Sequence, residues 1–229
     1  HLWAERFDRD LADVFAVQDE VVARIVEALV GRLAVGKLPE RKLPKNVEAY
    51  DLCVRGRFLF QRSGEEDGKQ ARLLFQRAIA LDPQNLAAYL ERSRAWYQKL
   101  DYDKMIADCD AALQLDPKSA IAYNLRGNAW DAKKEYDKAI QDYTESLKIE
   151  YRNPTNISNR AKVYRKLGAL GMALADYNQA IALSAGFAAA ISYRYRGDFW
   201  IEMQEYDLAI KDFSEALNLN PTLTVAYNN

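Results

Sequence analysis

The sequence predicts an all-α solenoid of stacked helical hairpins, and three features carry this prediction. Residues 120–151 divide into two amphipathic halves around a polar turn at residues 133–136. In the first half Tyr123, Gly127 and Trp130 fall on one face of an α-helix. The pattern returns about every 34 residues, and a hairpin of this size cannot bury its apolar face without a neighbour.

Five hairpins can be aligned in this way, and a sixth begins after Pro221. A residue of limited size is expected wherever the two helices of a hairpin cross. The first helices carry such residues at Gly56, Ser93, Gly127, Ala161 and Gly197. The second helices carry Ala139, Ala173 and Ala209 for the reciprocal reason. Large aromatic rings are then expected to fill the space between one hairpin and the next.

This two-helix unit, with an aromatic, a small and an aromatic residue in its first helix and a proline after its second, resembles the tetratricopeptide repeat. The closing element of that pattern stands at Leu81-Asp82-Pro83, Leu115-Asp116-Pro117 and Leu219-Asn220-Pro221. The resemblance covers about residues 47–229 and implies a right-handed superhelix whose concave inner wall binds a peptide or protein. Local departures replace a glycine, alanine or proline of the pattern at Ser93, Ala161, Met105, Tyr151 and Ala185.

Residues 1–36 are interpreted as a strand-like leader followed by a helix that caps the N-terminal end of the solenoid. An apolar stripe at helical spacing runs from Leu11 to about Val35. Residues 37–46, with two prolines and several charges, form a linker, and residues 47–229 form the array. Within the array, the acidic stretch 63–68 is predicted to be a mobile turn.

The N-terminal stretch HLWAERFDRDLADVFAVQDEVVARIV resembles the end of a small module that precedes tetratricopeptide arrays in bacterial nucleotide cyclases and winged-helix regulators. This resemblance implies a larger bacterial signalling protein with a catalytic or DNA-binding domain upstream. It would also leave residues 1–9 as an unpaired sheet edge. Because such edges pair with other chains, a homodimer through this segment is an alternative.

Composition argues against several classes of partner. The 229 residues include 32 Lys and Arg and 33 Asp and Glu, with an isoelectric point near 6.0, whereas nucleic-acid binders present a broad basic surface. No apolar run reaches membrane-spanning length, and no secretory signal is evident. Cys53 and Cys109 lie in different hairpins, and Cys109 takes a core position. We expect a reducing, cytoplasmic location and no nucleic-acid or membrane partner for this segment.

Two charged rows follow the repeat. Arginines stand just before the small residue of every first helix, at Arg55, Arg92, Arg126, Arg160 and Arg196. Aspartates stand in the last four second helices, at Asp108, Asp142, Asp176 and Asp212, with Leu74 in the first. One interpretation is an internal ladder of ion pairs that keeps the helices in register. The other is a line of arginines that faces a ligand.

The inner wall is predicted to be lined by first-helix residues one turn away from the packing face. The candidate peptide-binding residues are Arg94, Tyr97, Asn124, Asn128, Asp131, Asn159, Lys162, Arg165, Arg194 and Asp198. Several are cations, and cations on a concave wall favour extended, acidic peptides. Some members of the family grip a carboxylate with two lysines, two asparagines and an arginine. Only Asn128 and Asn159 match that clamp, so chaperone-tail binding is not predicted.

The sequence lacks the residue patterns that a catalytic site would require. The sole histidine is His1, no glycine loop could cradle a phosphate, and the carboxylates follow the repeat or lie in turns. We therefore expect no catalytic residue, no metal site and no cofactor. The predicted function is a non-catalytic scaffold for a peptide or protein. The alternative is a structural spacer that self-associates through the N-terminal segment or the C-terminal end.

Overall fold

A computed structural model describes residues 46–62 and 64–222. The predicted leader, the capping helix, most of the linker and nearly all of the sixth unit lie outside these residues. The chain divides into two units, residues 1–43 and residues 44–229, and the description concerns the second unit alone.

Within the described residues the secondary structure is helical, with ten α-helices and no strand. The first helices of the hairpins are α2 (Val47–Gln61), α4 (Leu86–Gln98), α6 (Ala120–Ala132), α8 (Pro154–Lys166) and α10 (Gly186–Glu202). The second helices are α3 (Glu65–Leu81), α5 (Tyr102–Leu115), α7 (Tyr136–Ile149), α9 (Leu170–Leu183) and α11 (Tyr206–Leu219). The predicted all-α, right-handed superhelical solenoid of hairpins is confirmed.

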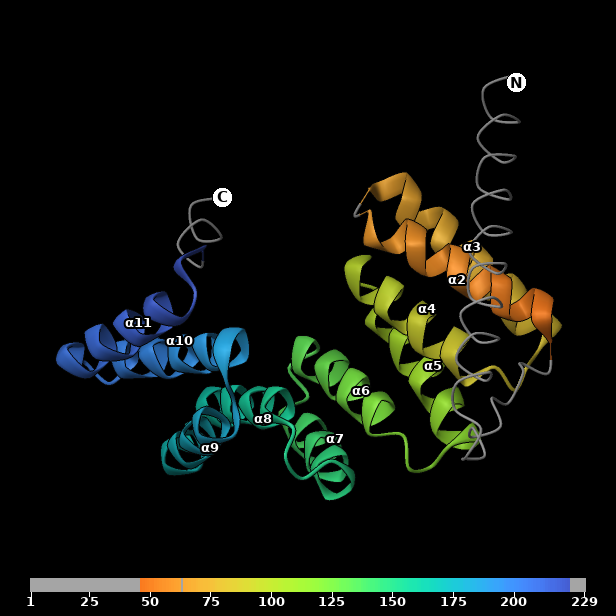
Figure 1. The fold of residues 1–229 in the computed structure, drawn as a ribbon. Helices are drawn as coiled ribbons and strands as arrows, with labels where there is room; N and C mark the ends of the chain where they lie inside the picture. The colour runs from red at the N-terminus through yellow and green to blue at the C-terminus, as the bar shows by residue number, and fades with distance from the viewer. Residues whose placement is uncertain (1–45, 63, 223–229) are drawn as a thin grey trace, which may run out of the picture. The chain divides into compact units, whose positions relative to one another are not determined.

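Each first helix packs against the second helix of its own hairpin, and each hairpin packs against the next. Figure 1 follows this order from the orange pair α2 and α3 to the blue pair α10 and α11. The first helices of successive hairpins also touch one another, as α4 touches α6 and α8 touches α10. We call the surface formed by these first helices the inner wall.

Side-chain caps explain where several helices begin. Asn46, Asn85, Asp101, Ser119 and Asn153 each accept a hydrogen bond from a backbone N–H in the first turn of the helix that follows. These bonds satisfy amides that have no partner within the helix. Short polar residues at these places therefore fix the start of α2, α4, α5, α6 and α8.

The crossing points show why the repeat needs a small residue. A Cβ atom at Gly127 would lie 2.8 Å from the ring of Tyr143, and one at Gly197 would lie 2.6 Å from the ring of Phe213. The ring therefore occupies the space that a larger first-helix residue would fill. In the second hairpin Ser93 replaces the glycine, and the facing residue is the small Cys109.

The acidic stretch at 63–68 was predicted to be a turn, and this prediction is wrong for most of its length. Helix α3 begins at Glu65, so Glu65, Glu66 and Asp67 form its first turn. Carboxylates are favourable there because the N-terminal end of a helix carries partial positive charge. The acidic run therefore starts a helix instead of interrupting one.

Candidate functional site

The arginine and aspartate rows form a regular ladder of ion pairs. The Nε and Nη2 atoms of each arginine donate to the two carboxylate oxygens of one aspartate in the same hairpin, over 2.6 to 3.0 Å. The pairs are Arg92–Asp108, Arg126–Asp142, Arg160–Asp176 and Arg196–Asp212. The ladder interpretation is confirmed, and the interpretation of these four arginines as ligand-facing is wrong.

The remaining guanidinium nitrogen of three arginines reaches back to the preceding hairpin. Nη1 of Arg126 donates to Asp110 over 2.6 Å, that of Arg160 to Thr144 over 3.2 Å, and that of Arg196 to Asn178 over 2.6 Å. Each of these side chains thus joins three helices. In the first hairpin Arg55 pairs instead with Asp51 of its own helix, because Leu74 offers no carboxylate.

The ladder carries opposing electrostatic effects. Burial raises the pKa of the Asp142 carboxyl above its usual value, and the Arg126 guanidinium offsets this rise only in part. The hydrogen bond from Arg126 to Asp142 raises the pKa of Arg126. The two short hydrogen bonds and the permanently charged guanidinium favour the ion pair at neutral pH. Since desolvation offsets much of the attraction, the pairs fix geometry more than they add net stability.

We call the contact between the third and fourth hairpins the third joint. It contains a chain of hydrogen bonds between polar side chains. Asn124 Nδ2 donates to Asn156 Oδ1 over 2.6 Å, and Asn156 Nδ2 donates to Ser146 Oγ over 2.6 Å. Ser146 in turn donates to the carbonyl of Ala120 over 2.8 Å. Asn156 and Ser146 are buried. Asn124 was a predicted binding residue, and its amide N–H is used between hairpins.

The two asparagines that matched the family's clamp meet in the same joint. Asn128 Oδ1 accepts hydrogen bonds from Tyr143 Oη over 2.7 Å and from Asn159 Nδ2 over 3.3 Å. Nearby, Asp131 accepts two bonds from Lys166 Nζ, over 2.6 and 2.8 Å. Three further candidate residues therefore hold adjacent hairpins together.

At the start of the inner wall, two cations share one carboxylate. Arg57 of α2 lies 3.2 Å from Glu91, and Arg94 of α4 lies 3.1 Å from the same carboxylate. Tyr97, one turn further along α4, is 46% exposed and packs its ring 6.0 Å from that of Tyr102. This part of the wall keeps positive charge beside an exposed ring.

The joint between the fourth and fifth hairpins, here the fourth joint, gathers the other candidate residues. Lys162 Nζ and the Arg194 guanidinium lie 4.7 and 4.4 Å from the centre of the Tyr195 ring. Arg194 also lies 3.7 Å from Asp198, while Arg165 lies 3.4 Å from Glu202. Burial raises the pKa of the Asp198 carboxyl, although the two arginines lower it. Among the described residues Lys162 has no ion pair.

Sequence reasoning assigned three of these neighbours no role in binding. Tyr195, Glu91 and Glu202 are not among the candidate binding residues that the sequence predicts. Repeat periodicity identifies which side chains face the wall, but it does not show which of them neutralise each other. A ring between two cations is recognisable only after two helices are packed together.

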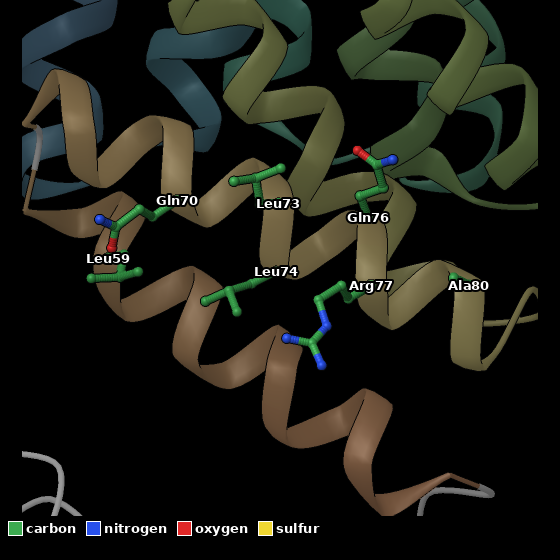
Figure 2. A pocket seen from close by; sticks show the side chains of 7 residues that line it. All are labelled: Leu59, Gln70, Leu73, Leu74, Gln76, Arg77 and Ala80. Carbon is green, nitrogen blue, oxygen red and sulfur yellow. The ribbon is translucent and has the colours of Figure 1, made fainter. Parts of the chain in front are cut away.

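A separate hollow lies on the first hairpin. It encloses about 490 Å³ and is lined by Leu59 of α2 and by several residues of α3. Figure 2 shows Leu74 and Arg77 pointing from α3 toward α2, whereas Leu73 and Gln76 lie on the other side of α3. Leu74 stands where the later hairpins carry the aspartate of the ladder. An apolar surface thus replaces the charged row here.

The described residues contain no group of three or more His, Cys, Asp and Glu side chains that could hold a metal ion. Over the same residues, none of the helices combines the length and the hydrophobicity that a membrane span requires. Cys53 and Cys109 are free and buried, and burial raises their pKa values to about 11 and about 12.

Models of the tetratricopeptide repeat family match residues 64–120, 120–150 and 157–187. One relative, "Putative adenylate cyclase 3" of Rhizobium meliloti (strain 1021), is 43% identical over 95 residues. That match spans 41% of this chain and 16% of the relative, so the matched stretch is a small part of the relative's length.

Three solved structures illustrate the likeness of the fold. MamA superposes with a TM-score of 0.60 at 21% identity, over 74% of this chain and 96% of its own. TTC0263, a thermophilic protein of Thermus thermophilus, superposes with a TM-score of 0.66 at 19% identity. The superposition covers 76% of this chain and 92% of TTC0263. The first repeat domain of Spaghetti (RPAP3), bound to the HSP90 peptide SRMEEVD, superposes with a TM-score of 0.51 at 23% identity. The superposition covers 53% of this chain and 94% of that domain.

Proposed function

Because this chain belongs to the tetratricopeptide repeat family, we propose that it is a non-catalytic scaffold that holds an extended, acidic peptide segment of a partner protein against its inner wall. The observation that carries the proposal is the composition of that wall. Its first helices form one continuous row and present Arg94, Tyr97, Lys162 and Ile201. Tyr97 and Ile201 are each 46% exposed, so apolar contact area lies beside the cations.

The charges of the wall favour an acidic partner. Arg57 and Arg94 share Glu91, and Lys162 has no carboxylate partner among the described residues. A carboxylate of a bound peptide would therefore gain charge-assisted hydrogen bonds at two places along the wall. The ladder arginines contribute nothing to this surface because each is held by an aspartate.

Peptide selection tests the proposal. The intact chain and a variant with Arg94→Glu, Lys162→Glu and Arg194→Glu are each panned against a display library of short random peptides. The matched control carries Lys118→Glu, Lys134→Glu and Lys211→Glu, which change the net charge equally at exposed positions outside the wall. We expect the intact chain and the control to enrich the same acidic peptides and the wall variant to lose them. Equal enrichment by all three folded proteins would contradict the proposal.

The cellular context is a second part of the proposal. The relative named as an adenylate cyclase is much longer than its match to this chain, and signalling proteins combine catalytic and interaction domains. We infer that this chain is the interaction arm of a larger bacterial signalling protein in the cytoplasm. Removing residues 47–229 from the parent protein should abolish the capture of its partner and leave its catalytic or DNA-binding domain folded.

Self-association is a second candidate function, and the C-terminal face of the array favours it. Ile106 of α5 is 9% exposed because α6 covers it, in a cluster with Leu125 and Ala129. The equivalent Ile210 of α11 is 63% exposed. This face is the kind of surface that accepts the next hairpin inside the array, so we infer that it is the surface through which a second copy associates.

Light scattering of the purified chain separates the two functions without any ligand. If the ends associate, the apparent mass rises with concentration, and Ile210→Glu returns it to that of one chain. Lys211→Glu, at the adjacent exposed position, is the control and should not change the mass. A mass that stays at one chain over the whole concentration range would rule out self-association.

A further inference from the structure

Helix α10 departs from the repeat in a way that builds a hollow. It has 17 residues, whereas α4, α6 and α8 have 13 each. The sequence shows two extra residues between 184 and 187, and the structure turns them into an additional helical turn at the start of α10. Phe187 lies in this turn and is 62% exposed.

The extra turn and α8 together line a hollow of about 240 Å³ on the inner wall of the fourth joint. Its apolar lining comes from Pro154 of α8 and from Phe187, Ile191 and Tyr195 of α10. Buried Ser158 and Ser192, whose hydroxyls lie 3.4 Å apart, also line it. Ligand pockets for metabolites typically enclose roughly 300–1,000 Å³, so this hollow suits a single side chain better than a free small molecule.

Tyr195 connects the hollow to the positive charges of the wall. One residue thus lines the apolar hollow while Lys162 and Arg194 lie against its ring. Arg194 has Asp198 at 3.7 Å, whereas Lys162 has no ion pair among the described residues. A carboxylate near Lys162 would therefore find a cation held in place by a ring.

We propose that this hollow receives an aliphatic side chain of an extended peptide, of the size of Leu, Ile or Met, and that Lys162 binds the carboxylate of an Asp or Glu next to it. The inference rests on the function proposed above and specifies where and how the peptide is read. The specificity arises from the irregular turn of α10, which the second, third and fourth hairpins lack. The first helices of those regular hairpins begin seven residues before the crossing residue, whereas α10 begins eleven residues before it. The residue at the place of Phe187 (Pro83, Pro117 or Tyr151) therefore lies outside the helix in those hairpins.

Phe187→Ala tests the hollow and Lys162→Gln tests the charge, both on peptides that the intact chain has enriched. Phe187→Ala removes one wall of the hollow, and Phe58→Ala is the control because Phe58 is a 50% exposed phenylalanine on α2. By fluorescence anisotropy we expect Phe187→Ala to weaken binding about tenfold, as truncation of an aromatic anchor does, and Phe58→Ala to leave it unchanged. Unchanged binding by Phe187→Ala would overturn the proposal.

Lys162→Gln tests the charge. Each enriched peptide is compared with a copy in which the acidic residue next to the aliphatic one is Gln. The intact chain should prefer the acidic peptide, and the Lys162→Gln variant should lose that preference while still binding the amide copy as well as the intact chain does. A preference that persists in the variant would contradict the proposal.

The result also separates this inference from the broader function. If peptides are enriched and lost in the triple wall variant, but Phe187→Ala and Lys162→Gln bind them normally, the wall binds and the subsite is wrong. If the intact chain enriches no peptide over the triple wall variant, both proposals fail together.

Discussion

The third and fourth joints occupy equivalent places in the repeat, yet they use their polar groups differently. At the third joint Asn124, Asn156 and Ser146 form a buried chain of hydrogen bonds. The equivalent residues at the fourth joint are Ser158, Ser192 and Ala180. There the two hydroxyls are 3.4 Å apart, and the alanine offers no side-chain partner.

The tyrosines of the same two hairpins show the same contrast. Tyr143 donates its hydroxyl to Asn128 over 2.7 Å. Tyr177 is equally buried, but its hydroxyl has no hydrogen-bond partner among the described residues, because Lys162 stands where Asn128 does in the preceding hairpin. The third joint uses its polar groups for stacking. The fourth joint leaves the buried Tyr177 hydroxyl and the Lys162 ammonium without such partners among the described residues, and the hollow that we propose as a peptide subsite lies at this joint.

The largest difference in stability between the two joints should come from variants of the ion-pair ladder. Asp176→Ala leaves Arg160 with only the Thr144 hydroxyl, whereas Asp142→Ala leaves Arg126 with the Asp110 carboxylate. We expect losses in the free energy of unfolding of about 3 kcal/mol for Asp176→Ala and about 2 kcal/mol for Asp142→Ala, since each leaves a half-buried cation less well paired. Urea unfolding followed by circular dichroism measures both.

Glu215→Ala on the exposed face of α11 is the control for the ladder variants, and it should change the free energy by less than about 0.5 kcal/mol. Full stability of either ladder variant would show that the charged rows do not hold the helices.

The next effect concerns the polar chain of the third joint. Asn156→Ala removes the amide between Asn124 and Ser146, and we expect a loss of about 2 kcal/mol, because buried partners lose their hydrogen bonds. Ser192→Ala, at the equivalent place in the fourth joint, should cost less than about 1 kcal/mol. Hydrogen exchange of the α7 and α8 amides would localise the loss. Equal costs for the two variants would remove the distinction between the joints.

A smaller effect is expected from the tyrosine hydroxyls. Tyr143→Phe should lower the free energy of unfolding by about 1 kcal/mol because it deletes a satisfied hydrogen bond. Tyr177→Phe should leave it unchanged or raise it, since it deletes a buried hydroxyl for which the described residues offer no partner. The two variants change the same atom at equivalent positions, so each is the control for the other. A loss in Tyr177→Phe as large as in Tyr143→Phe would mean that the hydroxyl has a partner in solution.

The smallest effect on stability should come from Phe187→Ala. Its side chain is largely exposed, so we expect a change below about 0.5 kcal/mol in the same urea experiment. A loss of binding in this variant then reports on recognition and not on folding. A large loss of stability would place Phe187 in the packing of α10.

The periodic part of the structure was predictable because helical spacing and small residues at crossings are local signals. Gly127 and Gly197 identify the contacts with Tyr143 and Phe213 before any coordinates exist. The pairing of arginines with aspartates was open between two interpretations, since periodicity places both rows without showing that they meet. The acidic run at Glu65–Asp67 was misassigned because carboxylates suit a helix start as well as a turn.

The candidate site was predicted only in outline. The spacing identified the first-helix residues of the wall, but it could not show that Asn124, Asn128 and Asn159 bond within and between hairpins. The two extra residues before Phe187 were visible in the sequence as a break in the repeat. Their consequence, an added turn of α10 beside Tyr195, was not.

The sequence by itself determined the repeat, the hairpins and the small residues at their crossings, because these depend on spacing along one helix or between two neighbouring helices. Only the tertiary structure decided which wall residues bond to each other and where a hollow lies between α8 and α10. Such contacts join side chains from different hairpins, about 34 residues apart in the sequence. Their distances depend on how tightly each joint packs, and no local pattern encodes that.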